Sequence, residues 1–174
     1  DKVMTYGQAV PGLTWASSGW VLNDSEADLL GLPTLQTSAS QYSAPGTYPI
    51  VASDALVPIT YQAEYRSGTF TVVKAPQELA FTNLATANLK VGDHFEATTS
   101  AGSSGRPVVL SSTVSTCTLE GATVSFIAAG EGIITENQAG DEYYLLAEPV
   151  SQSITVAKAP QDIAFTSTVP ANPA

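Results

Sequence analysis

Short runs of alternating apolar and polar residues follow one another along almost the whole chain. Residues 46–51 alternate in this way, and so do residues 59–65. A side-chain period of two residues is typical of a half-buried β-strand. Residues 66–68 supply a tight turn that ends in glycine, and a further alternating run follows at 69–73. The runs at 59–65 and 69–73 are therefore predicted to pair as a β-hairpin.

The second half of the chain continues the pattern, with Gly, Pro, Asn and Ser between the runs. The alternating runs lie at residues 78–82, 94–99, 108–112, 116–119, 122–127, 132–137 and 150–156. Helical periodicity is nearly absent: only residues 25–30, preceded by Asn23 and Asp24 as candidate N-caps, are predicted to make one or two helical turns. About seven short strands per module, with turns about every 8–12 residues, predict antiparallel sandwiches of two sheets.

Two segments of the chain are close copies of each other. Residues 70–82 read FTVVKAPQELAFT, and residues 154–166 read ITVAKAPQDIAFT, an offset of 84 residues. Repetition at a fixed period indicates an array of small domains. In each copy one alternating run ends and another begins, as expected at a junction. We predict domains at residues 1–75 and 76–158, with residues 159–174 as a linker and the start of a following repeat.

The junctions between modules are short and contain proline. They consist of Lys74, Ala75, Pro76 and Gln77, and of Lys158, Ala159 and Pro160. Proline fixes its own φ and restricts the residue before it, and a link of two or three residues cannot behave as a flexible coil. The sequence therefore predicts an all-β protein of two tandem sandwiches in an elongated arrangement with limited bending.

Composition narrows the possible partners and location. The chain carries 16 acidic and 6 basic residues, for a net charge of −10. This balance argues against nucleic acid and against an anionic membrane surface, since both need clustered Lys and Arg. No run of about 20 apolar residues is present, so no membrane insertion is expected in this segment. The single Cys117 excludes a disulfide-stapled extracellular module of the animal type. Bacterial surface proteins often lack cysteine, and the composition of this chain suits them.

The residues needed for catalysis are scarce, and the chain is predicted not to be an enzyme. His94 is the only histidine, and it follows a Gly-Asp turn, where we interpret it as a strand-edge residue. No serine lies in a Gly-x-Ser-x-Gly motif. Cys117 lacks a His or Asn pattern that would activate it, and is interpreted as a small buried apolar thiol. No organic cofactor is expected.

Calcium is the metal for which the chain offers candidate ligands. Asp24, Glu26 and Asp28 lie within a few residues of each other, and Asp141 belongs to a second acidic tip. Calcium takes about six to eight oxygen ligands, but the spacing does not match an EF-hand loop. Alternatively, residues 23–28 form a capped helical turn in which acids near the N-terminus are favourable. Both interpretations stay open.

The aromatic residues of the first module also allow two interpretations. Trp15 and Trp20, together with Tyr6, are candidates for a surface that stacks on carbohydrate. More often, such side chains fill the core of a small sandwich, where each large ring buries roughly 150–250 Å². Tyr143 and Tyr144, beside the acidic tip, are candidates for exposed contacts.

The first module carries a recognisable set of residues and short motifs: Tyr6-Gly7, Pro11, Leu13-Thr14, Ser18-Gly19, Asn23-Asp24, residues 31–35, residues 45–50, and Tyr61 with residues 65–72. In these residues it resembles the MBG family of bacterial Ig-like repeats. The chain departs from the family at Trp15, where members usually carry Tyr or another residue, and at Asn23, where they carry Gly.

The second module carries a set of its own: Gln77, residues 80–82, residues 91–93, residues 104–108, residues 128–130, residues 138–141 and residues 152–156. In these residues it is similar to a bacterial Ig-like repeat. The two resemblances imply structural stalk repeats of a bacterial surface or secreted adhesin that project a distal binding domain, with neighbouring Ig-like repeats as partners. The alternative is a module that binds a glycan or host protein through Trp15 and Trp20. The host or surface ligand is not indicated by the sequence.

Overall fold

A computed structural model describes residues 1–83, 88–113 and 115–166 of the chain. These residues form an all-β structure of several sheets, mostly antiparallel, consistent with the predicted β-sandwich fold. By its contacts the chain divides into two compact units, each of which is described by itself. The first unit contains Asp1–Glu78, Ala101–Pro107 and Gln138–Glu148, and the second contains Leu79–Ser100, Val108–Asn137 and Pro149–Ala174. Within the described residues, no helix is long and apolar enough to cross a bilayer.

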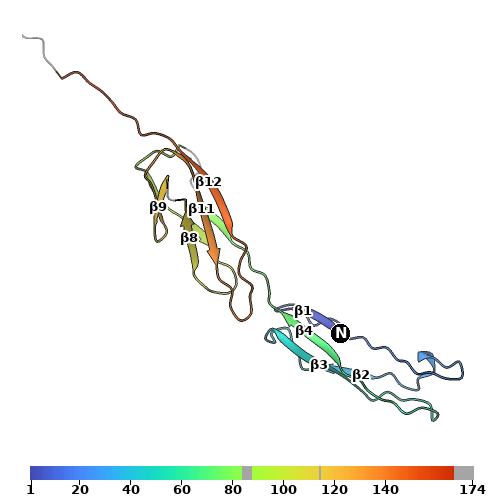
Figure 1. Cartoon of the computed structure of the whole chain (residues 1–174). Coiled ribbons are helices and arrows are strands. Elements are labelled where there is room, and N and C mark those ends of the chain that lie inside the picture. Colours follow the sequence, from blue (N-terminus) through green and yellow to red (C-terminus); the bar gives the residue numbers. More distant parts are fainter. Residues whose placement is uncertain (84–87, 114, 167–174) are drawn as a thin grey trace, which may run out of the picture. The chain divides into compact units, whose positions relative to one another are not determined.

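The first unit is built on one four-stranded sheet (Figure 1). Its strands are β1 (Lys2–Thr5), β2 (Thr34–Thr37), β3 (Gly46–Ser53) and β4 (Gly68–Val73), in the spatial order β1-β4-β3-β2. β1 runs parallel to β4, whereas the other pairs are antiparallel. The alternation of the sequence places one set of side chains in the core, which consists of Met4, Ala39, Ile50, Phe70 and Val72.

The predicted hairpin of residues 59–65 with 69–73 is wrong. The second of these runs does form β4, but residues 61–67 belong to no strand. Both edges of β4 are already occupied, because β3 pairs with one edge and β1 with the other. The described part of this unit therefore has four strands rather than the predicted number of about seven.

The predicted helical turn is shorter than expected and begins later. It is the 3₁₀-helix η1 (Glu26–Asp28), and its N-cap is Ser25 rather than Asn23 or Asp24. Leu22 and Asn23 take positive φ values of 58° and 69°, so the chain is still in a tight turn at this point.

The second unit contains the remaining strands, arranged in three sheets. They are β5 (Ala80–Asn83), β6 (His94–Glu96), β7 (Thr98–Ser100), β8 (Val108–Ser112), β9 (Cys117–Glu120), β10 (Thr123–Phe126), β11 (Gly130–Gln138) and β12 (Val150–Val156). The sheets have the orders β6-β10-β9, β12-β11-β8 and β5-β7. The core is formed by Leu89, Ala97, Cys117, Val124, Phe126, Ile134, Ile154 and Val156.

Candidate functional site

The junction segment, which we define as residues 74–77, is held by two loops of the first unit. We call Ala101–Pro107 and Gln138–Glu148 the junction loops. Ala75 is buried and forms a parallel bridge with Tyr144. Its N–H donates to the carbonyl of Tyr143 at 3.0 Å, and its carbonyl accepts from Leu145 N at 2.8 Å. The backbone of the segment is therefore paired with a neighbouring chain segment, as in a sheet.

Gln77 bonds to both junction loops at once. Its side chain is only 6% exposed. Nε2 donates to the carbonyls of Ala139 at 3.1 Å and Leu145 at 2.9 Å, while Oε1 accepts from Ser104 N at 3.0 Å. A buried amide whose donors and acceptor are all paired holds the backbone groups to which it is hydrogen-bonded in place, here one from each of Ser104, Ala139 and Leu145.

Two glycines let the junction loops approach closely. A Cβ atom on Gly102 would lie 2.5 Å from Oε1 of Gln138 and 2.8 Å from Oε1 of Gln77. On Gly140 it would lie 2.5 Å from the carbonyl oxygen of Tyr144. All three distances are shorter than van der Waals contact. A side chain at Gly140 would meet backbone, and one at Gly102 would displace the side chains of Gln138 and Gln77.

Tyr6 packs against the same loops through its ring. Its centroid lies 4.8 Å from that of Tyr143, 5.7 Å from that of Tyr144 and 6.2 Å from that of Tyr42. Tyr143 and Tyr144 are half-buried, rather than the exposed contacts that the sequence allowed. Burial, followed by the neighbouring Tyr144, raises the pKa of the Tyr6 hydroxyl. Aromatic pairs of this kind add to the free energy of packing beyond the area they bury.

Asp141, one of the calcium candidates, caps its own loop. Its Oδ1 accepts from the backbone N–H groups of Tyr143 and Tyr144, both at 2.8 Å. Desolvation opposes ionisation, but these two hydrogen bonds and the positive charges of Arg106 and Lys74 outweigh it, so the pKa of Asp141 is lowered. Lys74 also donates through Nζ to the backbone carbonyl of Asp141 at 2.5 Å.

The other calcium candidates are also bonded to donors of the chain. The Asp24 carboxylate lies 2.7 Å from the Tyr61 hydroxyl, and Glu26 accepts from Ser17 N at 2.8 Å. Asp28 accepts from Ser25 N at 2.8 Å and closes a capping box. In the described ranges, no group of three or more His, Cys, Asp or Glu residues could hold a metal ion. Calcium binding stays a prediction without support from this geometry.

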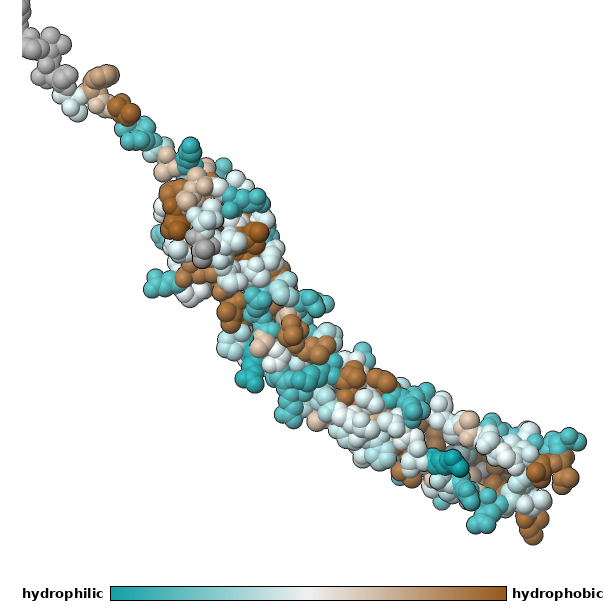
Figure 2. Space-filling view, in the orientation of Figure 1, coloured by the Kyte–Doolittle hydropathy of each residue, from teal (hydrophilic) through white to brown (hydrophobic). Residues whose placement is uncertain are grey.

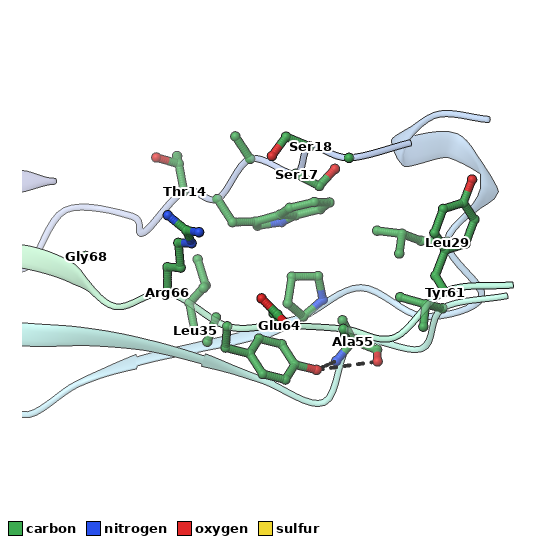
Figure 3. Close-up of a pocket in the computed structure, with 18 of the residues that line it drawn as sticks. Thr14, Ser17, Ser18, Leu29, Leu35, Ala55, Tyr61, Glu64, Arg66 and Gly68 are labelled. Carbon is green, nitrogen blue, oxygen red and sulfur yellow. Dashed lines mark hydrogen bonds between the residues drawn. The ribbon is translucent and has the colours of Figure 1, made fainter. Parts of the chain in front are cut away.

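Trp15 and Trp20 line a groove of the first unit, with a volume of about 730 Å³. Figure 3 shows Thr14, Ser17 and Ser18 along one side of it, with Leu35 and Ala55 on the other. Both indoles are half-buried. Trp20 Nε1 donates to Ser17 Oγ at 2.9 Å. Its ring forms an edge-to-face pair with Tyr61, and the two ring centroids are 5.2 Å apart. The two tryptophans therefore neither fill a closed core nor form an open platform.

The remaining candidates lie elsewhere. His94 is exposed on β6, and Cys117 is 1% exposed in the core of the second unit, as predicted for an apolar thiol. The second junction differs from the first, because Lys158, Ala159 and Pro160 are all exposed.

Sequence reasoning named the junction segment but missed most of what holds it. Ser104, Gln138 and the pair Tyr143-Tyr144 lie in loops, where no periodicity marks a buried residue. One signal was present, because Gln77 recurs as Gln161 after the second Ala-Pro. A polar residue that recurs at a junction indicates a specific hydrogen-bonding role.

The sheets and cores described above define an all-β protein of the sandwich type. Residues 1–71 match the family model of the MBG domain (YGX type), which agrees with the family predicted for the first module. MBG-type domains are found in bacterial surface proteins. A comparison with curated proteins found no match. The assignment of the second module to bacterial Ig-like repeats stays a prediction.

Proposed function

We propose that this chain is part of the stalk of a bacterial surface or secreted adhesin, where its modules act as a spacer that projects a distal binding domain. The observation that carries the proposal is the junction segment. A spacer needs joints that resist bending. Residues 74–77 follow β4 directly, and Ala75 and Gln77 pair them with loops 101–107 and 138–148, which belong by sequence to the next predicted module.

The match of residues 1–71 to the MBG domain supports an extracellular, cell-surface location. The low content of basic residues supports a role that does not involve nucleic acid or an anionic membrane. The predicted partners are neighbouring repeats of the same protein, because the junction sequence recurs after 84 residues. The proposed role requires no catalytic group and no cofactor.

Small-angle X-ray scattering tests the spacer directly. A compact globule of 174 residues would have a radius of gyration of about 16 Å. We expect a clearly larger value and a distance distribution with a long tail. A radius close to that of the compact globule would refute the spacer. Because self-association also raises the radius, the measurement is extrapolated to zero concentration.

Backbone ¹⁵N relaxation supplies a second test of the same proposal. If the junction is stiff, amides of both units will report one common anisotropic rotation. If the units rotate independently, each will report the shorter correlation time of a domain of its own size, and the stiff-spacer function will be wrong.

Recognition of a glycan or host protein is the second candidate function, and it is favoured by the position of Trp15 and Trp20 on the groove. It predicts that a saturating ligand will protect both indoles from acrylamide quenching. A glycan array with no hit above background, for the wild-type chain and for a Trp15→Ala, Trp20→Ala control alike, would remove the glycan version of this candidate.

A further inference from the structure

Four tyrosines gather where the junction loop Gln138–Glu148 meets the end of β1. Large apolar side chains are exposed at separate places over the surface (Figure 2). The rings of Tyr6, Tyr42, Tyr143 and Tyr144, in contrast, lie together. Tyr6 is the centre of this tyrosine cluster, because the centroids of the other three rings all lie 6.2 Å or less from its own. Phenol rings in such contact can react with each other once they are oxidised.

Hydrogen bonds to one extended segment hold Tyr6 and Tyr143 in place. Tyr6 N donates to the carbonyl of Val73 at 2.9 Å, and the carbonyl of Tyr143 accepts from Ala75 N at 3.0 Å. Leu145 N donates to the carbonyl of Ala75 at 2.8 Å. Alternate carbonyls of an extended strand point to the same edge, so Tyr6 and Leu145 bond to the same edge of the chain that continues β4. The junction loop thus takes up the pairing where β1 ends.

The three contacts of Tyr6 differ in geometry. The ring of Tyr143 is the nearest, at 4.8 Å between centroids, and the two planes are inclined by 36°. Tyr144 and Tyr42 meet Tyr6 edge to face, with interplanar angles of 84° and 66°. Oxidised phenols join through the ring carbons next to the hydroxyl-bearing carbon, and the linked rings lie edge to edge with inclined planes. An edge-to-face pair must rotate to reach that arrangement, so Tyr143 is the ring best placed to join to Tyr6.

We propose that Tyr6 and Tyr143 form an oxidative cross-linking site, at which a carbon–carbon bond joins the two rings as dityrosine. The oxidant is hydrogen peroxide, used by a haem peroxidase that removes one electron from each phenol. Each phenol releases its hydroxyl proton with the electron, and the two radicals couple at ring carbons beside the hydroxyl-bearing carbons. The hydrogens on the coupled carbons then move to the oxygens, which restores both hydroxyls and both aromatic rings. Peroxide takes up the two electrons and two protons and becomes two water molecules.

Tyr42 gives the oxidant access to the cluster. Its ring is 70% exposed and lies edge-on to the half-buried ring of Tyr6. An electron lost from Tyr42 at the surface is replaced by one from Tyr6 over this contact, so the peroxidase does not have to reach Tyr6 itself. Tyr143 is half-buried and keeps part of its own ring at the surface.

The fold favours coupling within one chain over coupling between chains. Tyr143 N donates to Asp141 Oδ1 at 2.8 Å, and its carbonyl bonds to Ala75, so the backbone on both sides of the ring is fixed. Reactive groups that are held in contact react without a diffusional encounter, which raises their effective concentration by orders of magnitude. The cross-link is therefore expected to form in dilute protein, where chains seldom collide.

The new bond would close the junction segment into a covalent ring of structure. It ties the end of β1 to the junction loop, and both of these bond to the chain between Val73 and Ala75. A covalent link between residues far apart in sequence stabilises a fold mainly by constraining the unfolded chain. In a spacer, this would make the joint harder to open. That consequence rests on the proposed function, whereas the cross-link itself does not.

The test oxidises the full chain in dilute solution with hydrogen peroxide and a catalytic amount of a haem peroxidase. The monomeric product is isolated by size-exclusion chromatography, and its proteolytic peptides are mapped by mass spectrometry. We expect dityrosine fluorescence in the monomer, a mass lower by two hydrogen atoms, and a linked peptide pair that contains Tyr6 and Tyr143. A monomer without a cross-link, or a link that joins Tyr6 to Tyr42 or Tyr144, would overturn the proposal.

Phenylalanine variants assign the two reacting rings. Tyr143→Phe keeps a ring in the same contact but cannot form the phenoxyl radical, and it is expected to lower the yield of dityrosine in the monomer at least tenfold. Tyr144→Phe, the matched control at the adjacent residue, is expected to keep the wild-type yield. Both variants retain an aromatic ring, and their circular dichroism spectra should match that of the wild type. Equal yields from the two variants would overturn the assignment to Tyr143.

Hydrogen exchange measures what the bond does to the junction. In the cross-linked monomer, the amides of Ala75 and Leu145 are expected to exchange at least tenfold more slowly than in the untreated chain, because local opening must now strain a covalent link. Unchanged exchange would overturn the locking of the junction segment. The spacer function is tested by the scattering of the untreated chain, so either proposal can fail without the other.

Discussion

The side chain of Glu136 is buried in the second unit without a hydrogen-bond partner. It is 0% exposed on β11, and neither carboxylate oxygen has a partner among the described residues. Desolvation penalises the charged form and raises the pKa of this carboxyl. Because the pKa in the folded state lies above that in the unfolded state, the folded protein favours the protonated form.

Stability should therefore fall as pH rises through the folded pKa of Glu136, and be fully retained below the unfolded value of about 4.3. Replacing Glu136 with Gln removes the charge and keeps the shape. We expect a gain of roughly 1–3 kcal/mol in the free energy of unfolding at pH 8, and little change at pH 4. Thermal melts across this pH range provide the measurement. Glu131→Gln, an exposed change on the same strand, is the control and should leave the profile unaltered.

Gln77 contrasts with Glu136, because the buried polar groups of its side chain have hydrogen-bond partners. Gln77→Ala would leave Ser104 N and the carbonyls of Ala139 and Leu145 without their present partner. Unsatisfied buried groups cost about 1–3 kcal/mol each, less where water enters. A loss of a few kcal/mol in chemical denaturation is expected, against almost none for Gln62→Ala, which is exposed. If both variants unfold at the wild-type midpoint, Gln77 does not hold the loops.

At the level of strands, periodicity identified most of the elements but not their partners. The runs predicted at 108–112 and 150–156 coincide with β8 and β12, because every second residue of each strand is buried or half-buried. The equally regular run at 59–65 failed because β3 and β1 already pair with β4. Alternation records which side chains face inward, and it carries no information on whether a neighbouring strand is present.

Because sequence patterns are local, they predicted where the junction lies but not which loops hold it. Proline and the repeated Lys-Ala-Pro-Gln marked its position, since these are local features of the sequence. The loops that hold it lie 27 residues from Gln77 at Ser104, and 68 residues away at Leu145. Pairings over such separations depend on the fold of the whole unit and leave no local pattern.

Tyr143 should be required for the order of the junction loop Gln138–Glu148. Its ring lies 4.8 Å from that of Tyr6, and its carbonyl accepts from Ala75 N. With Tyr143→Ala, hydrogen exchange at the amides of Ala75 and Leu145 is expected to accelerate at least tenfold, because the stacking that holds the pairing in place is lost. Tyr42→Ala, which removes a ring that is 70% exposed, serves as the comparison. Equal protection in both variants would contradict this role for Tyr143.

At the scale of the whole molecule, the proposed spacer depends on Pro76. Glycine at this position would restore backbone freedom in the middle of the junction segment. Distances between spin labels at Thr47→Cys and Ala122→Cys, both exposed positions, should become more broadly distributed in Pro76→Gly. Cys117 is buried and should not take up a label. Pro11→Gly, remote from the junction in sequence, should leave the distribution as it was. A distribution unchanged by Pro76→Gly would mean that proline contributes nothing to stiffness.

The parallel pairing of β1 with β4 determines how the first unit would respond to tension. A pull on Asp1 acts at the beginning of β1, and a pull on Val73 acts at the end of β4, so the two strands are drawn past each other in opposite directions. All the bonds of that ladder are then sheared together rather than unzipped one by one. The rate of forced unfolding follows the barrier to this concerted rupture. Stretching the chain therefore loads the β1–β4 ladder in shear, the direction in which its hydrogen bonds resist force together.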